Sequence, residues 1–245
     1  MHQPVKWVAN LPHVREVSIL GLADLAYWKD RLRQADLVPA ERAGQAQILI
    51  VAGDARFAGV RFREVSFSVL LWTQRAVSQQ GRAYLVHAVN SCRAFAFCER
   101  TFFSTPYYYG QVRMAGSIPA SIELVRDGEV IFRAEMPART PSEDRKPSCC
   151  RDDGWEGPVF LPEPRGRTTT RGKLFFARIR GYTKTYPFVQ PDDSLEIKPS
   201  AGSPVLQALL ESHFVPIEWI LREDAEHAKS KTYKRSAMLE ELIHA

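Results

Sequence analysis

Residues 121–136 constrain the fold of this chain more than any other segment. Two runs of alternating apolar and polar residues flank Asp127-Gly128, a dipeptide that readily takes the positive φ angles of a two-residue hairpin turn. Residues 61–72 alternate in the same way, and their apolar face holds Val65, Phe67, Val69 and Leu71. A period of two residues fits a strand and not a helix, so we expect much of the core to be sheet.

The other elements follow from local residue patterns. Apolar and β-branched runs predict strands at 47–52, 82–90, 107–114 and 173–186. Apolar residues at helical spacing predict helices at 22–35 and 92–103, and a third helix begins at Pro204, after the capping residue Ser203. We expect one curved sheet to contain residues 61–72, 82–90, 107–114, 118–126, 129–136 and 173–184. About eight strands and three or four helices favour an α+β fold with a largely antiparallel, barrel-like sheet.

Two regions break this pattern within what we expect to be a single domain of residues 1–245. Residues 137–172 hold six prolines and predict a long loop. Within it, we expect 138–154 to be the most mobile internal segment, and the apolar residues 155–161 to pack near the mouth of a pocket. The charged chain from about residue 223 predicts a surface helix. Its solvated basic patch consists of Lys229, Lys231, Lys234 and Arg235.

Composition narrows the class of protein. Of the 245 residues, 45% are hydrophobic and 25% are charged, which is typical of a soluble globular protein. The net charge is +5, but basic residues are interleaved with acidic ones and no nucleic-acid-binding motif is present, so we expect no nucleic-acid partner. Residues 1–17 lack the apolar stretch of a signal peptide, and no apolar run is long enough to span a membrane. We therefore expect a cytoplasmic protein without a membrane partner.

Motifs for common cofactors and metals are missing. The chain has no glycine-rich nucleotide- or dinucleotide-binding motif, no H-E-x-x-H zinc motif and no G-x-S-x-G serine-hydrolase motif. Its six histidines share no metal-ligand spacing, and no two of its four cysteines have the C-x-x-C spacing. We expect no metal, no cofactor, and free thiols in a reducing compartment.

Three features are candidates for chemistry, and each also has a purely structural explanation. Glu64 shares a strand face with two serines; this face either meets solvent or lines a barrel interior, where burial raises the pKa of a carboxyl. The three tyrosines 107–109 either pack in the core or offer phenol donors to a pocket. Arg178 and Arg180 either lie on an exposed sheet face or bind a carboxylate.

The order of several motifs resembles the acetoacetate decarboxylase superfamily. Phe62-Arg63-Glu64-Val65 is followed by Tyr84–Val89, by the predicted helix 92–103 and by Pro106-Tyr107-Tyr108-Tyr109-Gly110. Residues 100–108 are similar to the R-x-F-F-x-x-P-Y-Y stretch of the DUF2071 (YqjF-like) branch, which the chain resembles most closely. The resemblance covers roughly residues 20–136. It implies a cone-shaped antiparallel β-barrel with an interior pocket, in which Glu64 takes the place of a pocket glutamate.

The resemblance also implies that the chemistry differs from that of the decarboxylases. These enzymes form an imine on a lysine in a P-K-K-x-G element, with a second lysine beside it, whereas residues 106–110 here carry tyrosines that cannot form an imine. The family's second pocket glutamate has no counterpart in residues 73–81. Of the other lysines, Lys29 and Lys146 lie in segments expected outside the sheet, while Lys173 and Lys184 flank a strand and stay open.

Two hypotheses of function remain. In the first, the protein is an enzyme that acts on an oxo acid or enolisable ligand by acid–base chemistry without a lysine imine. Its catalytic residues would be Glu64, Tyr107 and Tyr108, and its substrate-binding residues Tyr84, His87, Tyr109, Arg113 and Arg178. In the second, the protein binds a small molecule in the same pocket without catalysis. In both, the ligand is a small molecule, with a carboxylate favoured, and a homo-oligomer is one option for assembly.

Overall fold

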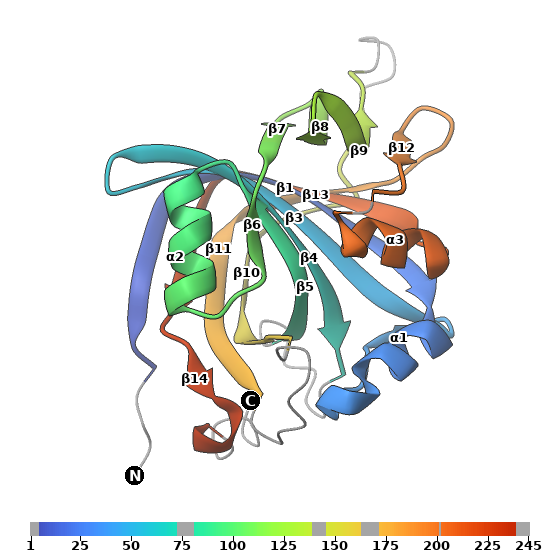
Figure 1. The fold of residues 1–245 in the computed structure, drawn as a ribbon. Helices are drawn as coiled ribbons and strands as arrows, with labels where there is room; N and C mark the ends of the chain where they lie inside the picture. The colour runs from blue at the N-terminus through green and yellow to red at the C-terminus, as the bar shows by residue number, and fades with distance from the viewer. Residues whose placement is uncertain (1–4, 73–80, 139–145, 163–171, 201, 239–245) are drawn as a thin grey trace.

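A closed ring of seven strands is the main element of the structure, a computed structural model that describes residues 5–72, 81–138, 146–162, 172–200 and 202–238. The ring is drawn in Figure 1. Its strands, in spatial order, are β1 (Trp7–Asp24), β13 (Val215–Ser230), β11 (Lys173–Pro187), β10 (Cys149–Phe160), β5 (Arg82–Asn90), β4 (Val60–Leu71) and β3 (Gln45–Phe57). Pairing of β1 with β3 along residues 15–24 closes the ring.

The ring is mostly but not wholly antiparallel. Strands β10 and β5 run parallel where Val159 and Phe160 meet Ala83 and Tyr84. The short strand β6 (Tyr107–Tyr109) also runs parallel to β5, while β2 (Glu41–Arg42) pairs with β3, and β14 (Tyr233–Lys234) pairs with β11. The structure is therefore an α+β fold built on a mixed sheet.

The second sheet has four strands and packs on the outside of the ring. Its order is β12 (Ser194–Ile197), β9 (Glu129–Met136), β8 (Ala120–Arg126) and β7 (Gln111–Ala115). The predicted hairpin is confirmed: Asp127 and Gly128 form its turn with φ angles of 51° and 84°. Phe132 of β9 meets Phe67 of β4 edge to face at 5.7 Å. The alternating apolar face of 61–72 therefore points out of the ring, into the core between the two sheets.

The expectation of one curved sheet was wrong. Tyr107–Tyr109 pairs with β5 in the ring, whereas Gln111–Ala115 pairs with β8 in the second sheet. Gly110 separates the two, and its backbone N–H bonds to the carbonyl of Asn90, where the chain leaves β5. The alternation over 107–114 is real on both sides of this break. It does not reveal that the chain changes sheets, because periodicity reports local conformation and not strand partners.

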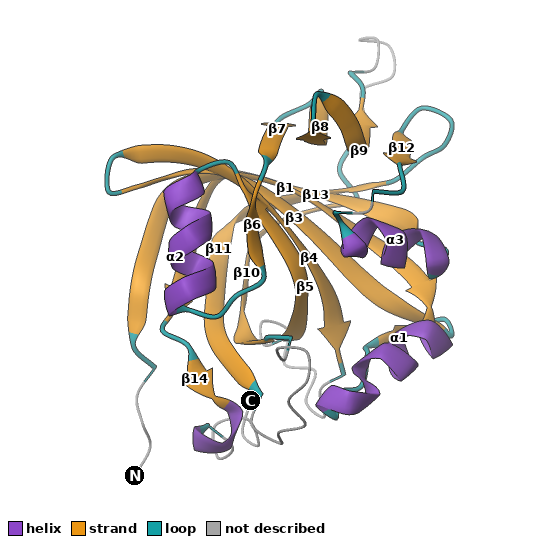
Figure 2. Ribbon diagram, in the orientation of Figure 1, coloured by secondary structure: helices purple, strands orange, loops and turns teal. Residues whose placement is uncertain are grey.

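Three helices flank the sheets: α1 (Leu25–Leu32), α2 (Arg93–Phe102) and α3 (Pro204–Glu211). Figure 2 shows α1 and α3 on one side of the ring and α2 on the other. The predictions for α2 and for the start of α3 at Pro204 are confirmed, but the Ser203 side chain makes no capping hydrogen bond. Helix α1 begins later than predicted, because residues 22–24 still pair with β3 and the Asp24 carboxylate accepts the N–H of Tyr27 at 2.6 Å as a cap. The 3₁₀ segments Arg33–Ala35 and Arg235–Ala237 are further helical elements of the described residues.

The predicted loop 137–172 contains a long strand. Residues 149–160 form β10 and pair with β11 along their whole length, so the loop prediction was wrong there. Among the described residues, only Val159 and Phe160 of β10 pair on its other side, and no described strand faces Pro158 there, so this proline costs no ladder hydrogen bond to the described strands. Residues 155–160 belong to this strand, and Trp155 lines the cavity described below. Residues 139–145 and 163–171 of the predicted loop lie outside the described residues.

Residues 223–230 of the charged segment do not form the predicted surface helix. Residues 223–230 continue β13, which pairs with β1 on one side and β11 on the other. The register shifts around Glu223 and Asp224: Val14 faces Ala225, and Glu16 faces Arg222. This β-bulge reverses which residues point inward, because it adds residues to one strand only. Several charged side chains of β13 therefore face the ring interior and not solvent.

A substitution at Gly21 tests how tightly the ring is packed. A Cβ atom on Gly21 would lie 2.2 Å from the Phe214 ring and 2.6 Å from the Val215 carbonyl oxygen. We expect Gly21→Ala to lower the free energy of unfolding by about 1–3 kcal/mol, measured by urea denaturation. Gly53→Ala is the matched control in β3, since its nearest neighbour, Val14, would be 3.4 Å away. Equal stability of the two variants would contradict the packing described here.

Candidate active site

A cavity of about 510 Å³ lies inside the ring. That volume suits a small-molecule ligand, whose pockets span roughly 300–1,000 Å³. The alternating strands place one set of side chains in the core and the other set in this cavity. The polar side chains in its wall include Glu16, Ser18, Glu64, Ser66, Ser68, Asn90, Glu99, Tyr107, Arg151, Asp153, Arg178, Arg222, His227 and Lys229. Of the two placements considered for Glu64 and its neighbouring serines, the structure shows the interior one.

Glu64 forms a buried group with Asn90 and Tyr107. The Asn90 amide donates to Glu64 Oε2 at 3.2 Å, and the Tyr107 hydroxyl bonds to the same carboxyl. Burial, followed by the charge of Glu99, raises the pKa of the Glu64 carboxyl. Burial and the neighbouring carboxylates hold the pKa of Tyr107 well above its usual range, so the phenol stays a donor. A carboxyl with a raised pKa beside a fixed donor is suited to proton transfer.

Lys229 and Glu99 form an ion pair in the same part of the cavity. Lys229 Nζ contacts Glu99 Oε2, which also accepts the hydroxyl of Thr105 at 2.7 Å. The Lys229 side chain is 16% exposed. Its ammonium lies over the rings of Phe103, Tyr107 and Phe175, at 5.1, 5.4 and 4.6 Å from their centroids. Burial lowers the pKa of Lys229, while Glu99 and Glu64 oppose that shift.

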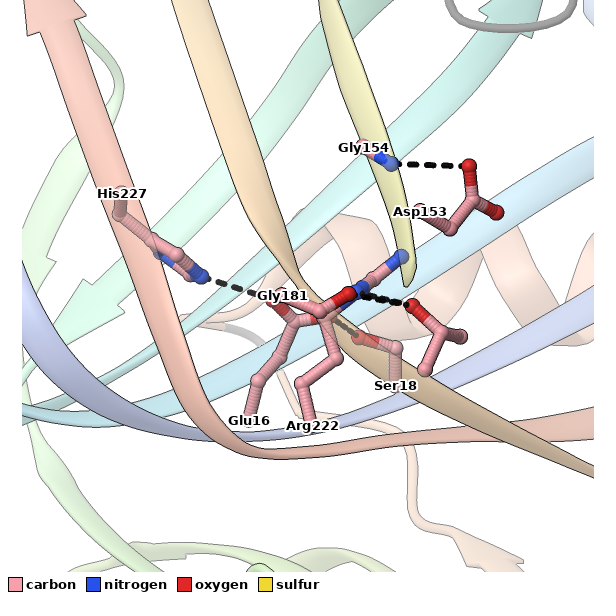
Figure 3. Close-up of polar contacts among 8 residues, drawn as sticks. Glu16, Ser18, Asp153, Gly154, Gly181, Arg222 and His227 are labelled. Atoms are coloured by element: carbon pink, nitrogen blue, oxygen red, sulfur yellow. Dashed lines mark hydrogen bonds and ion pairs between the residues drawn. The ribbon is translucent and has the colours of Figure 1, made fainter. Parts of the chain in front are cut away.

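A second cluster of charges surrounds Glu16 (Figure 3). Ser18 donates to Glu16 Oε1 at 2.9 Å, Arg222 pairs with the same oxygen, and His227 Nε2 lies 2.7 Å from Oε2. Arg222 also donates to the Thr183 hydroxyl at 2.8 Å. Burial alone would raise the pKa of Glu16, but Arg222, His227 and Ser18 outweigh it and lower the pKa to about 2. Glu16 is therefore a buried carboxylate that stays ionised.

The structure brings some predicted site residues to the cavity and not others. Glu64, Tyr107 and Arg178 line it, and Arg178 pairs with Glu226 at 3.3 Å. Five others do not line it: Tyr84, His87, Tyr108, Tyr109 and Arg113.

The side chains of these five residues lie outside the cavity for two reasons: side chains alternate along a strand, and the chain changes sheets after Tyr109. Tyr108 is 46% exposed and stacks on the His87 ring at 4.8 Å, and Tyr109 lies under the Arg93 guanidinium at 4.5 Å. Neighbouring residues on a strand face opposite ways, which turns Tyr108 away from the side of Tyr107. Tyr109, the last residue of β6, is 53% exposed and does not line the cavity. Arg113 sits on β7 in the second sheet, 3.6 Å from Glu123.

Seven acidic or basic residues of the cavity wall were missed from the sequence: Glu16, Glu99, Arg151, Asp153, Arg222, His227 and Lys229. A signal was present for Arg222, because residues 215–222 alternate and contain β-branched and aromatic residues typical of a strand. The β-bulge interrupts this alternation before His227 and Lys229. Their charges then indicated a solvated helix, since charged residues are rarely buried unless paired.

Two further properties concern metals and membranes. Among the described residues, no group of three or more histidine, cysteine or acidic side chains is placed to hold a metal ion. In the same residues, no helix combines the length and the apolar character needed to cross a bilayer.

Comparison with known proteins identifies the fold. No family model and no curated protein sequence matches the chain. Among solved structures, acetoacetate decarboxylase from Legionella pneumophila is 15% identical, with a TM-score of 0.58 over 95% of this chain and 91% of that chain. An acetoacetate decarboxylase-like enzyme from Sphingomonas wittichii RW1 is 11% identical, with a TM-score of 0.57 over 95% and 93%.

A third structure, the enduracididine biosynthesis enzyme MppR complexed with pyruvate, is 12% identical, with a TM-score of 0.58 over 96% and 91% of the two chains. At these identities the likeness shows the fold alone. The chain thus has the mostly-sheet α+β fold of acetoacetate decarboxylase-like proteins.

The Glu16 cluster predicts a specific dependence of stability on pH. A folded-state pKa near 2, below the ordinary 4.5, stabilises the protein above about pH 4.5, and this contribution is lost as the pH falls toward 2. Between about pH 5 and about pH 3, we expect the wild type to lose about 2 kcal/mol more unfolding free energy than Glu16→Gln, measured by urea denaturation. Glu196→Gln, which changes an exposed carboxylate of β12, should keep the wild-type dependence. Parallel pH profiles of the wild type and Glu16→Gln would contradict the pKa assigned to Glu16.

Proposed function

We propose that this protein is an enzyme that acts on a small oxo acid, or another enolisable carbonyl compound, by acid–base chemistry inside the cavity. The observation that carries the proposal is the Glu64–Tyr107 pair. An ionisable carboxyl with a raised pKa and a phenol locked as a donor share a buried cavity of ligand size. In a protein that only binds its ligand, burying this carboxyl beside that of Glu99 would destabilise the fold without serving catalysis.

The proposed reaction begins with enolisation. Glu64, as the carboxylate, takes a proton from the carbon next to the ligand carbonyl. The electron pair of that C–H bond becomes the C=C bond, and the carbonyl π electrons move to oxygen. Tyr107 donates to the resulting enolate oxygen, and burial strengthens that hydrogen bond by excluding water. A raised pKa makes Glu64 a stronger base than an exposed glutamate, which favours this role.

Arg178 is the proposed contact for the ligand carboxylate. Its guanidinium lines the cavity, 22% of its side chain is exposed, and one nitrogen lies 3.3 Å from Glu226. A planar guanidinium accommodates carboxylates through paired N–H groups. The MppR structures, which hold pyruvate and a pyruvate condensation product, support an oxo acid as the first ligand to test.

The relation to the DUF2071 branch also remains a proposal. It is supported by residues 100–108, the stretch on which that resemblance rests, since this stretch contributes Phe103 and Tyr107 to the cavity wall. No family model matches the chain, so this placement depends on the motif and not on an alignment.

The Glu64 role is tested by proton exchange. We expect the wild type to exchange the methyl protons of pyruvate, or the C3 protons of 2-oxobutyrate, for deuterium in D₂O, followed by ¹H NMR. Glu64→Gln should abolish exchange with the fold intact, because the amide keeps the size of the side chain and removes the base. Glu196→Gln is the control and should exchange like the wild type. Binding of these acids without exchange would support the non-catalytic hypothesis; exchange by Glu64→Gln at the wild-type rate would refute Glu64 as the base.

Tyr107→Phe separates the donor from the base. Loss of one hydrogen-bond donor to a developing oxyanion costs on the order of a hundredfold in rate. We expect a reduction of about that size or smaller, and therefore a milder effect than Glu64→Gln. The exposed Tyr108→Phe is the matched control, because its ring stacks on His87 outside the cavity. A larger effect of Tyr108→Phe than of Tyr107→Phe would place the chemistry elsewhere.

A further inference from the structure

The cavity contains several charged groups that the proposed reaction does not use, and one of them, Lys229, lies over the Tyr107 ring. Lys229 is the sole lysine among the described residues that line the cavity. It was not identified from the sequence as a site residue, and it enters the ring from β13, a strand far along the chain from the tyrosines 107–109. Its position raises the question of what a buried ammonium does there.

The contacts of Lys229 favour the charged form of its side chain. One partner of Nζ is the Glu99 carboxylate, which the Thr105 hydroxyl holds in place at 2.7 Å. The other neighbours are the faces of three aromatic rings, at 4.6 to 5.4 Å. Aromatic faces attract cations, and a carboxylate in contact stabilises an ammonium further. An ammonium has three N–H groups, and Glu99 is its only hydrogen-bond partner in the described part of the chain.

The ammonium is close to the groups of the proposed reaction. Lys229 lies over the ring of Tyr107, whose hydroxyl bonds to Glu64. The charges of Lys229 and Glu64 influence each other directly, since each shifts the pKa of the other toward its ionised form. Negative charge that develops between Glu64 and Tyr107 would thus form beside a fixed positive charge.

We propose that Lys229 is a further catalytic residue, whose ammonium donates to the ligand oxygen and stabilises the enolate. Glu99 is its positioning residue. This inference rests on the proposed function and adds one residue to it. In the step, Glu64 receives the proton from carbon, the oxygen gains the negative charge, and Lys229 keeps its proton while hydrogen-bonding to that oxygen. No bond forms between the ligand and Lys229, and no oxidant or reductant is needed.

The decisive variant removes both charges of the pair at once. Lys229→Met alone leaves Glu99 buried without a partner and risks misfolding. Lys229→Met with Glu99→Gln replaces the pair by neutral side chains of similar size. If Lys229 serves only to neutralise Glu99, this double variant exchanges pyruvate protons like the wild type. If Lys229 stabilises the enolate, exchange falls by about a hundredfold or more, although the fold is kept.

A surface pair of the same type is the matched control. Lys184 and Glu223 lie 2.9 Å apart, with 37% and 60% of their side chains exposed. Lys184→Met with Glu223→Gln should leave the exchange rate unchanged. Circular dichroism and thermal unfolding check that each double variant is folded. Lys229→Arg, which keeps the positive charge, should retain more exchange than the neutral double variant.

The outcomes separate this inference from the proposed function. If the wild type shows no exchange, both are refuted. If Glu64→Gln abolishes exchange but the Lys229/Glu99 double variant retains it, the role of Lys229 is refuted and the proposed function stands. Borohydride treatment with pyruvate, followed by peptide mass spectrometry, should give no adduct. An adduct on Lys229 would overturn the ammonium role, because it shows that the side chain reacts as a free amine.

Discussion

The pairing of β13 with β1 and β11 at the same time is the interaction on which the rest of the structure depends. Strand β1 also pairs with β3, so β13 and β1 together join the first and last thirds of the chain into one ring. Without β13, both neighbours would have an unpaired edge, and the cavity would be open along one side. The strand that closes the ring also brings Arg222, His227 and Lys229 to the cavity wall.

Because side chains alternate along each strand, the inner and outer faces of the ring differ in chemistry. On β4, Val65, Phe67 and Val69 point outward into an apolar core shared with the second sheet. The opposite face of the same strand carries Glu64 and two serines into the cavity. One strand therefore contributes to stability through one set of residues and to the candidate site through the other. Substitutions on the two faces should consequently affect different properties of the protein.

The sequence predicted much of the local structure and part of the site. The strand at 82–90 and the turn at Asp127-Gly128 were found because alternation and turn residues act over a few neighbours. Glu64 was found because its strand alternates without interruption. Glu99 and Lys229 were missed for a physical reason. A charged side chain usually indicates a solvent-exposed position, and only a partner of opposite charge from a distant element makes its burial possible. That partner cannot be read from local spacing.

The bulge at Glu223 and Asp224 has a consequence for how this cavity could change in evolution. Upstream of the bulge, the inward side chains of β13 include the even-numbered Ile220 and Arg222; downstream, they include the odd-numbered His227 and Lys229. Deleting one bulge residue would restore a continuous alternation. His227 and Lys229 would still face the cavity, because the deletion moves every downstream residue by one position and so keeps its side of the strand. A single-codon deletion at the bulge, or its reversal, would therefore change the number of residues in β13 without changing which side chains line the ligand.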